Sequence, residues 1–121
     1  MKVEVKVLNK EDIEKFFKNT KQKIAKDTEK AVFRSTLLMQ NEVKLSIAGQ
    51  KQEPASVDTG RFLNSIDIRT IKNEGLVFTD IEYAKFLEYG TSRIKSRSHF
   101  RNSLYRNKTQ IKNIFKESIY S

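Results

Sequence analysis

The tripeptide Asp58-Thr59-Gly60 has the residue types of an aspartic-protease active site, where paired carboxylates act as acid and base. Such enzymes consist almost entirely of strands, and apolar residues flank their motif. Here Arg61 follows the motif and a helical pattern over Lys10–Ala48 precedes it, which leaves too little chain for an all-β fold. We therefore interpret Asp58 or Thr59 as the cap of a short helical turn that is entered through Gly60.

His99 is the only histidine of the chain, so a cluster of histidine metal ligands and a two-histidine acid–base pair are both excluded. A small RNA-cleaving enzyme of the toxin type could use one histidine with Arg61, Arg93, Arg97 and a tyrosine. Nothing in the spacing demands this, and a polar histidine in a loop before a helix is the more common case. The four glycines stand far apart, so no glycine-rich phosphate loop is present. We predict no catalytic residue, no metal, no cofactor and no enzymatic activity.

The net charge of +9 is concentrated in the last quarter of the chain. Eight lysine or arginine residues and no acid occur after Tyr89 up to and including Lys116. A basic face of this kind can meet nucleic acid, an acidic protein or only solvent. Candidate contacts, to DNA through its backbone charge or to another protein chain, are Arg93, Lys95, Arg97 and Arg101.

Composition bounds the class of protein. A chain of 121 residues predicts a single domain over residues 1–121. The absence of cysteine excludes disulfides and thiolate metal sites and is typical of a reducing cytoplasm. No apolar run approaches the ~20 residues that span a bilayer. Residues 1–8 alternate charge with valine and are unlike a signal peptide, so we expect no membrane association.

The first half of the chain predicts a strand and a long helix. Val3, Val5 and Val7 alternate with charged residues, the pattern of a half-buried strand. From Lys10 to about Ala48 there is no proline or glycine, which predicts one amphipathic helix, with a break near residues 26–27 left open. Its apolar stripe comprises Ile13, Phe17, Ile24, Ala31, Leu38 and Leu45, widened by Phe16, Phe33, Leu37 and Ile47. The polar connection over residues 49–57 is long for a compact domain, and we expect it to be mobile.

The second half predicts a hairpin and a C-terminal helix. Ile66, Ile68 and Ile71 form one strand, Lys72–Gly75 a turn, and Leu76–Ile81 the returning strand. The C-terminal helix has on one face Phe100, Leu104, Ile111, Phe115 and Ile119. Phe100 and Tyr105 among basic residues also suggest single-strand nucleic-acid binding, but burial is the better interpretation for Phe100. The predicted fold is α+β, a small antiparallel sheet packed against one long helix and a C-terminal helix.

The stretch Tyr83–Thr91 lies between the hairpin and the basic segment. Its spacing places Tyr83, Phe86, Leu87 and Tyr89 around one or two helical turns, with Glu88 among them. Gly90 is expected to end the turn by taking a left-handed conformation. We predict a packed helical turn that is capped by glycine.

The order of two motifs resembles one protein family, the tail-completion or head–tail joining proteins of long-tailed bacteriophages and prophages. The first motif is followed by the hairpin and then by the second, and the residues that carry the resemblance are Asp58, Thr59, Gly60, Arg61, Ser65, Ile66, Tyr83, Ala84, Glu88, Gly90 and Thr91. The resemblance covers roughly Val57–Leu104. The family continues with a Pro-Phe-Leu-Arg-Pro-like stretch. Here Phe100, Arg101 and Leu104 fit that stretch, and both prolines are missing.

The resemblance implies a structural protein of the virion at the head–tail junction, assembled in the bacterial cytoplasm. Its partners would be other neck and tail proteins and copies of itself in a ring that continues the DNA channel, and it would have no small-molecule substrate. The alternative from another class is a small basic nucleic-acid-binding or RNA-cleaving toxin-like module. We further expect the two motifs to pack together, with Arg61 and Glu88 paired so that the charge of each is compensated.

Overall fold

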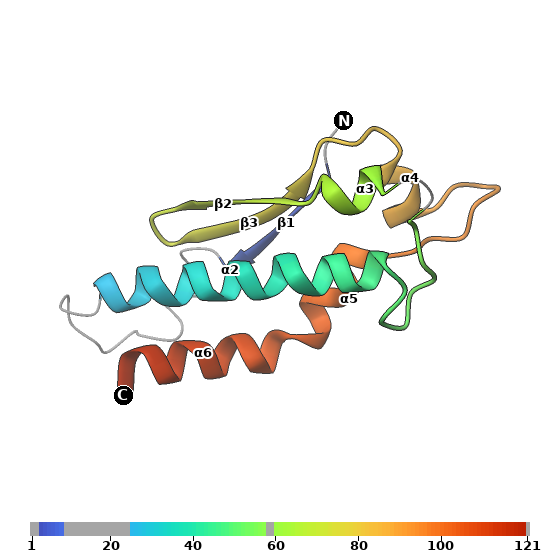
Figure 1. Ribbon diagram of the computed structural model, residues 1–121. Helices are drawn as coiled ribbons and strands as arrows, with labels where there is room; N and C mark the ends of the chain where they lie inside the picture. The colour runs from blue at the N-terminus through green and yellow to red at the C-terminus, as the bar shows by residue number, and fades with distance from the viewer. Residues whose placement is uncertain (1–2, 9–24, 58–59, 121) are drawn as a thin grey trace.

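The computed structural model describes residues 3–8, 25–57 and 60–120 (Figure 1). The part of the predicted long helix that precedes Ala25 therefore lies outside the described residues, as do Asp58 and Thr59 of the first motif.

The three strands of the described chain form one antiparallel sheet. β1 (Val3–Leu8) and β2 (Asp67–Ile71) pair with opposite edges of β3 (Glu74–Thr79), so the order is β1-β3-β2. Val77 of β3 pairs with a residue of each neighbouring strand and is 1 % exposed. The first strand, predicted from its alternating valines, and the predicted hairpin are thus confirmed.

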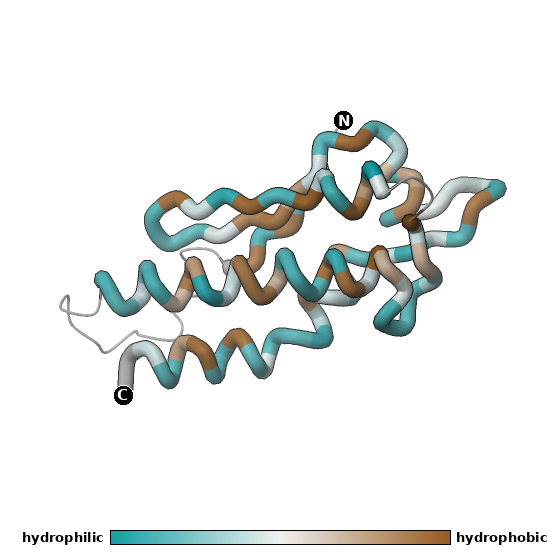
Figure 2. The backbone as a smooth tube through the Cα atoms, in the orientation of Figure 1, coloured by the Kyte–Doolittle hydropathy of each residue, from teal (hydrophilic) through white to brown (hydrophobic). Residues whose placement is uncertain are grey.

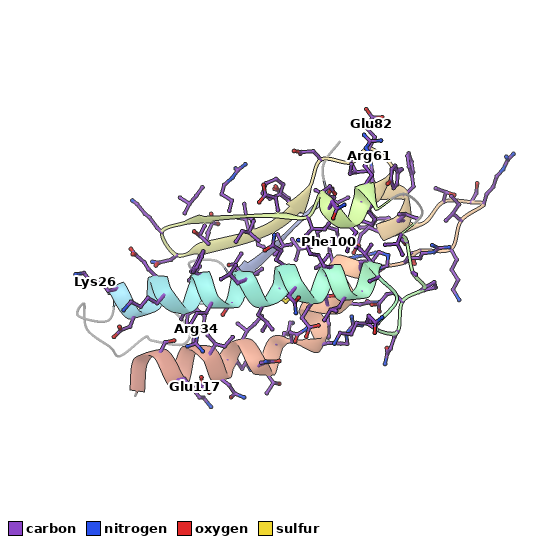
Figure 3. The ribbon with its side chains drawn as sticks, viewed as in Figure 1. Lys26, Arg34, Arg61, Glu82, Phe100 and Glu117 are labelled. Atoms are coloured by element: carbon purple, nitrogen blue, oxygen red, sulfur yellow. The ribbon has the colours of Figure 1, made fainter. Side chains whose placement is uncertain are left out.

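The helices lie in two layers on one side of the sheet. α2 (Ala25–Ile47) contacts all three strands, α5 (His99–Arg106) contacts both α2 and β1, and α6 (Lys108–Tyr120) packs on α2 away from the sheet (Figure 1). Arg34 of α2 and Glu117 of α6 form an ion pair at 3.5 Å on the surface of this second contact (Figure 3). The predicted α+β fold is confirmed, with α6 packed mainly on α2 rather than on the sheet.

Two short helices, α3 (Arg61–Asn64) and α4 (Ala84–Tyr89), lie beside one end of the sheet (Figure 1). α3 follows Gly60, whose φ of 75° is in the left-handed region that favours glycine. α4 ends at Gly90, which also has a positive φ of 75°, so the predicted stop is confirmed. The loop between α4 and α5 projects from this end of the molecule (Figure 1).

The hairpin turn is shorter than the predicted Lys72–Gly75. Ile71 pairs with Glu74, which leaves only Lys72 and Asn73 in the turn. Lys72 has a φ of 50°, as a two-residue hairpin requires of its first turn residue.

Gly75 lies within β3, so the prediction that it belongs to the turn is wrong. A Cβ atom on Gly75 would lie 2.0 Å from Oγ1 of Thr36 in α2, and 3.5 Å from the side chain of Val32. The missing side chain allows the long helix to pack closely on the central strand. A glycine inside a strand often marks such a close approach.

The face that α2 buries differs from the predicted stripe. Ala31 and Ile47 are buried as expected, but Phe33 and Leu37 are 47 % and 41 % exposed, so their predicted core positions are wrong. The side chains of α2 that lie over Gly75 of β3 are those of Val32 and Thr36. The buried face of α2 includes the polar side chains of Thr28, Ser35, Thr36 and Ser46.

The predicted C-terminal helix is divided at Asn107. The Asn107 side chain donates to the Ser103 carbonyl at 2.8 Å, and its backbone N–H donates to the carbonyls of Ser103 and Leu104. Phe100, before the division, is fully buried in the interior (Figure 3), and Ile111 and Phe115 after it are also buried. The predicted apolar face is therefore correct for these residues, while the single helix is not.

Candidate docking site between the two motifs

The two motifs lie against each other, although not through the predicted pair of Arg61 and Glu88. The rings of Phe62 in α3 and Tyr83 before α4 meet edge to face, with centroids 6.0 Å apart. At the end of α3, the Ser65 hydroxyl donates to the Phe62 carbonyl at 2.6 Å. The same hydroxyl is hydrogen-bonded to the Thr79 hydroxyl, also at 2.6 Å. Ile66 and Ala84 are buried in the core. Most described motif residues therefore shape the packing of this end of the sheet.

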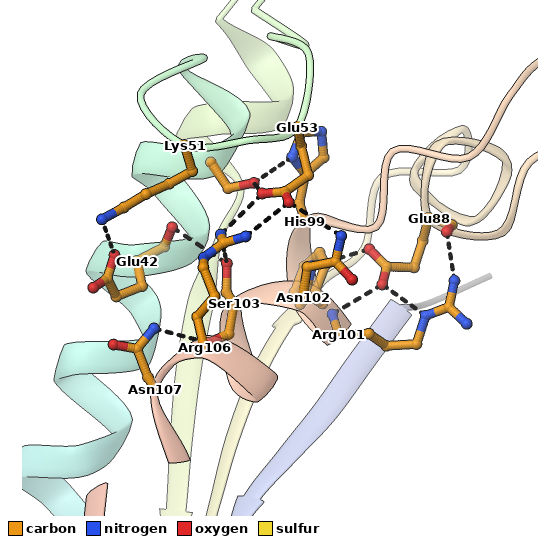
Figure 4. Close-up of polar contacts among 12 residues, drawn as sticks. Glu42, Lys51, Glu53, Glu88, His99, Arg101, Asn102, Ser103, Arg106 and Asn107 are labelled. Carbon is orange, nitrogen blue, oxygen red and sulfur yellow. Dashed lines mark hydrogen bonds and ion pairs between the residues drawn. The ribbon is translucent and has the colours of Figure 1, made fainter. Parts of the chain in front are cut away.

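Glu88 is paired with Arg101, and the predicted pair between Glu88 and Arg61 is wrong. The Glu88 carboxylate, 2 % exposed, accepts the backbone N–H of Phe100 and that of Arg101, each at 3.0 Å (Figure 4). The Arg101 Nε–H donates to the same carboxylate at 3.1 Å, and its Nη2 donates to the Glu88 carbonyl at 2.7 Å. Glu88 thus caps α5 from another segment, with its charge at the positive end of the helix.

This cap accounts for the beginning of α5 in a chain that has no proline at this place. His99 is the first residue of α5, and Phe100 and Arg101 are the second and third, whose N–H groups have no partner within the helix. The side chain of Ser98, at the cap position, makes no capping bond to them.

The predicted helical turn is α4, but the rings around it lie at the surface rather than in the interior. Ala84 and Glu88 face inward, while Tyr83, Phe86 and Tyr89 are 39 %, 44 % and 57 % exposed. The inward position of Glu88 fixes this orientation, because side chains one and two positions away on a helix point elsewhere.

A second buried network holds the connection between α2 and α3. Glu53 is 6 % exposed, and its carboxylate accepts Arg106 Nη1 at 2.8 Å and Asn102 Nδ2 at 3.1 Å (Figure 4). It also accepts the Ser46 hydroxyl at 2.5 Å. The Ser46 oxygen bonds to Nδ1 of His99 at 2.7 Å. One carboxylate therefore ties together the connection, α2 and α5.

His99 is fully buried, so the interpretation of it as a polar loop histidine is wrong. Its Nδ1 faces Ser46 and its Nε2 lies 2.9 Å from the hydroxyl of Ser56. The ring of Phe62 lies edge to face with the imidazole at a centroid distance of 6.0 Å. Burial lowers the pKa of His99 to about 4; nearby Glu53 raises it, and Arg97 and Arg106 lower it further. The ring is therefore neutral at pH 7.

Hydrogen-bond directions within this network follow from the charge of Glu53. Burial alone would raise the pKa of Glu53, but the bonds from Arg106, Ser46 and Asn102 outweigh it and lower the pKa to about 2. The carboxylate can only accept, so Ser46 donates to it and accepts from Nδ1–H of His99. Nε2 is then an acceptor, and Ser56 donates its proton to it.

These bonds tether the connection over residues 49–57, which we predicted to be mobile. Besides the contacts of Glu53, the Ser56 N–H donates to the Ile47 carbonyl at 2.7 Å, and Arg97 Nη1 donates to the Ala55 carbonyl at 2.7 Å. The mobility of the connection remains a prediction. Glu53, Ala55 and Ser56 are held by these bonds, whereas other residues of the connection are exposed.

A depression of about 720 Å³ opens where the connection, α3, α4 and the loop before α5 meet. Its polar groups come from Ser56, Arg61, Tyr83 and Arg97, and its apolar surface from Ala55, Val57 and Leu87. Among the residues that the structure describes, no carboxylate lines it. The first motif contributes Arg61 and the second contributes Tyr83 and Leu87, so the two motifs form opposite parts of one concave surface.

The predicted basic contacts divide into two groups. Arg93 and Lys95 are exposed in the loop between α4 and α5, around the apolar Ile94 (Figure 2). The Thr91 hydroxyl accepts the N–H groups of Arg93 and Ile94 at 3.1 and 3.0 Å and so shapes this loop. Arg97 and Arg101 instead make the bonds within the protein described above, and Arg101 also lies over the Tyr89 ring at 4.3 Å.

Within the described chain, no cluster of three or more His, Cys, Asp or Glu side chains could hold a metal ion, and no helix is long and apolar enough to span a membrane. Comparisons of the whole chain with models of protein families, with curated proteins and with solved structures gave no match.

Sequence reasoning missed the residues of the Glu53 network. Its members are separated by up to 60 positions in the chain, from Ser46 to Arg106, and the pair of Glu53 and Arg106 carries no spacing signal. One clue is that Glu53 is the only acid in the connection of a chain whose net charge is +9, so cationic partners for its carboxylate are numerous in the chain.

Proposed function

We propose that this protein is a structural subunit of the head–tail junction of a long-tailed bacteriophage or prophage, acting in a ring that joins tail to head. The observation that carries the proposal is the ordered pair of motifs in the sequence. Their contact in the fold supports it, because residues of both motifs shape one surface. The isolated subunit needs no cofactor for this role.

Ring closure requires a surface of one subunit to meet a different surface of its neighbour. The loop carrying Arg93, Ile94 and Lys95 is a candidate for one of these surfaces, since it projects beyond the helices (Figure 1) and combines charge with the exposed apolar side chain of Ile94. The depression is a candidate for the other. Partners in the neck and tail, and non-specific contact with DNA in the channel, belong to the same proposal.

The geometry gives less support to the RNA-cleaving alternative. His99, its candidate acid or base, is fully buried, and both ring nitrogens already have serine partners. A phosphate could reach Nε2 only by displacing Ser56. General acid–base catalysis needs the histidine within hydrogen-bond reach of the substrate.

Deletion of the gene from an inducible phage tests the proposal. We expect filled heads and full-length tails that remain separate in electron micrographs, with infectivity restored by a plasmid copy. Normal joined virions from the deletion would exclude this function. Cleavage of RNA by the purified protein, lost in His99→Ala, would favour the alternative.

A further inference from the structure

The depression between the motifs presents cations, one hydrogen-bond acceptor and apolar surface together. Arg61 and Arg97 bring guanidinium groups from two separate segments, and none of the described residues that line the surface is an acid. Tyr83, 39 % exposed, and Leu87 add apolar area. A volume of about 720 Å³ is sufficient for several side chains of a bound peptide.

Arg97 is held in position before any ligand arrives. Its Nη1 donates to the Ala55 carbonyl at 2.7 Å and lies 3.3 Å from the Ser56 hydroxyl, and its backbone N–H bonds to the Leu87 carbonyl. A guanidinium group fixed at one nitrogen keeps further donors in a planar fork that matches a carboxylate. Little side-chain entropy is then lost when an anion binds.

The Ser56 hydroxyl discriminates between kinds of anion. Its proton is committed to Nε2 of His99, by the chain of bonds that begins at Glu53. The oxygen accepts from Nη1 of Arg97 at 3.3 Å and keeps one further lone pair for a donor in the depression. A phosphodiester has no N–H or O–H to donate to it, whereas a peptide carries a backbone N–H close to each side-chain carboxylate.

We propose that this depression binds an acidic peptide segment of a partner protein, with its carboxylates on Arg61 and Arg97, an apolar side chain against Tyr83 and Leu87, and a backbone N–H donated to Ser56. The inference rests on the geometry of the isolated subunit and does not need the head–tail proposal to be correct. Apolar surface beside the arginines favours a peptide over a nucleic-acid backbone, which would use the charge alone.

Fluorescence anisotropy with a labelled peptide of sequence Asp-Leu-Glu-Phe-Asp tests the proposal on the purified protein. The matched control peptide, Asn-Leu-Gln-Phe-Asn, has the same shape and no side-chain charge. We expect saturable binding of the acidic peptide and at least about tenfold weaker binding of the neutral one. Equal binding of both peptides, or no saturable binding of either, would overturn the proposal.

Three variants locate the site. We expect Arg61→Gln and Arg97→Gln each to weaken binding by about tenfold, and Arg93→Gln, on the exposed part of the same loop, by less than about twofold. Because Arg97 also holds the connection, Arg61→Gln decides the question if Arg97→Gln lowers the melting temperature. A loss with Arg93→Gln equal to that with Arg61→Gln would mean general charge attraction and refute a specific site.

Competition with a ten-nucleotide oligothymidylate distinguishes peptide from phosphate. We expect the oligonucleotide to displace the peptide only at low salt and with no dependence on Arg61. Displacement that is stronger than by the unlabelled peptide, and that is lost in Arg61→Gln, would identify a phosphate site and contradict the proposal.

Discussion

The Glu88 carboxylate lies 3.0 Å from the backbone nitrogen of Phe100, so an acid of the second motif closes the N-terminus of a helix that begins eleven positions later. A side chain at the cap position normally makes this bond. Here the charge comes from α4, and the loop between α4 and α5 is held at both ends as a result. The cap is thus a long-range contact, and it links the motif to the position of the projecting loop.

Replacing Glu88 by alanine should strongly destabilise the fold. The change removes a buried charge from its partner and leaves two N–H groups of α5 without an acceptor, so we expect a loss of about 3–5 kcal/mol in the free energy of unfolding. Urea denaturation measures this. Arg101→Ala is the matched control: its side chain is 48 % exposed, and its removal leaves the backbone bonds intact. We expect it to cost about 1 kcal/mol or less, and equal losses would show that the ion pair, not the cap, stabilises this end.

The stability of the protein should fall when the pH is lowered from 7 to 4. The pKa of His99 is about 4 in the fold and 6.5 ordinarily, so its neutral form is favoured by folding. That stability is complete above pH 6.5 and is lost as the pH falls through 4, on the order of 3 kcal/mol in total. Glu53, with a pKa of about 2 against 4.5, adds a further loss below pH 4.5.

Denaturation midpoints across this range test the prediction, with His99→Gln as the variant that should show a flatter dependence between pH 6.5 and 4.5. Nuclear magnetic resonance of the His99 ring gives a second measurement. A ring that titrates near 6.5 in the folded protein would contradict it.

The sequence was most informative where one segment determines its own structure. The alternation of Val3, Val5 and Val7 predicted a strand, and Gly90 predicted the end of a helical turn, because both signals are local. The partner of Glu88 was not predictable in this way. Arg61 and Arg101 are both arginines near an apolar run, and only the path of the chain between α4 and α5 brings Arg101 to the carboxylate.

The Glu53 network shows the same limit for buried polar groups. Glu53 and His99 are residue types that usually lie on the surface. In the interior both are hydrogen-bonded to Ser46, which belongs to α2. Buried polar groups are tolerated when they are hydrogen-bonded, and a sequence does not show whether a partner exists. The role of Gly75 was missed because a close helix–strand approach is a property of two segments.

Gly75→Ala should destabilise the contact between β3 and α2. The new methyl group would meet Oγ1 of Thr36, which is fully buried, so we expect a loss of about 1–3 kcal/mol from overpacking. Thr36→Ala in the same chain removes the obstructing oxygen and should recover part of this loss. A double-mutant cycle measures the recovery. Additive effects of the two changes would show that the residues do not limit each other.

Amide hydrogen exchange should divide the connection over residues 49–57. The Ser56 N–H is bonded to the Ile47 carbonyl and should exchange slowly, whereas the exposed Gln52 should exchange rapidly. Glu53→Gln weakens the bonds from Arg106 and should increase exchange at Ser56, while the exposed change Gln50→Ala should not. Rapid exchange along the whole connection of the unaltered protein would mean that its tethers do not hold it in solution.

Reversing the charge of the projecting loop should impair joining without unfolding the subunit. Arg93 and Lys95 are exposed, so changing both to glutamate should alter the free energy of unfolding by only about 0.5 kcal/mol each. If the loop meets a neighbouring chain or DNA in the junction, like charges placed together cost several kcal/mol, and the yield of infectious particles should fall by at least about tenfold. Lys112→Glu, an exposed change on α6, is the control for net charge. Complementation of a phage deletion with each variant measures the yield, and full infectivity of the Arg93→Glu/Lys95→Glu protein would exclude the loop from the contact that joins head to tail.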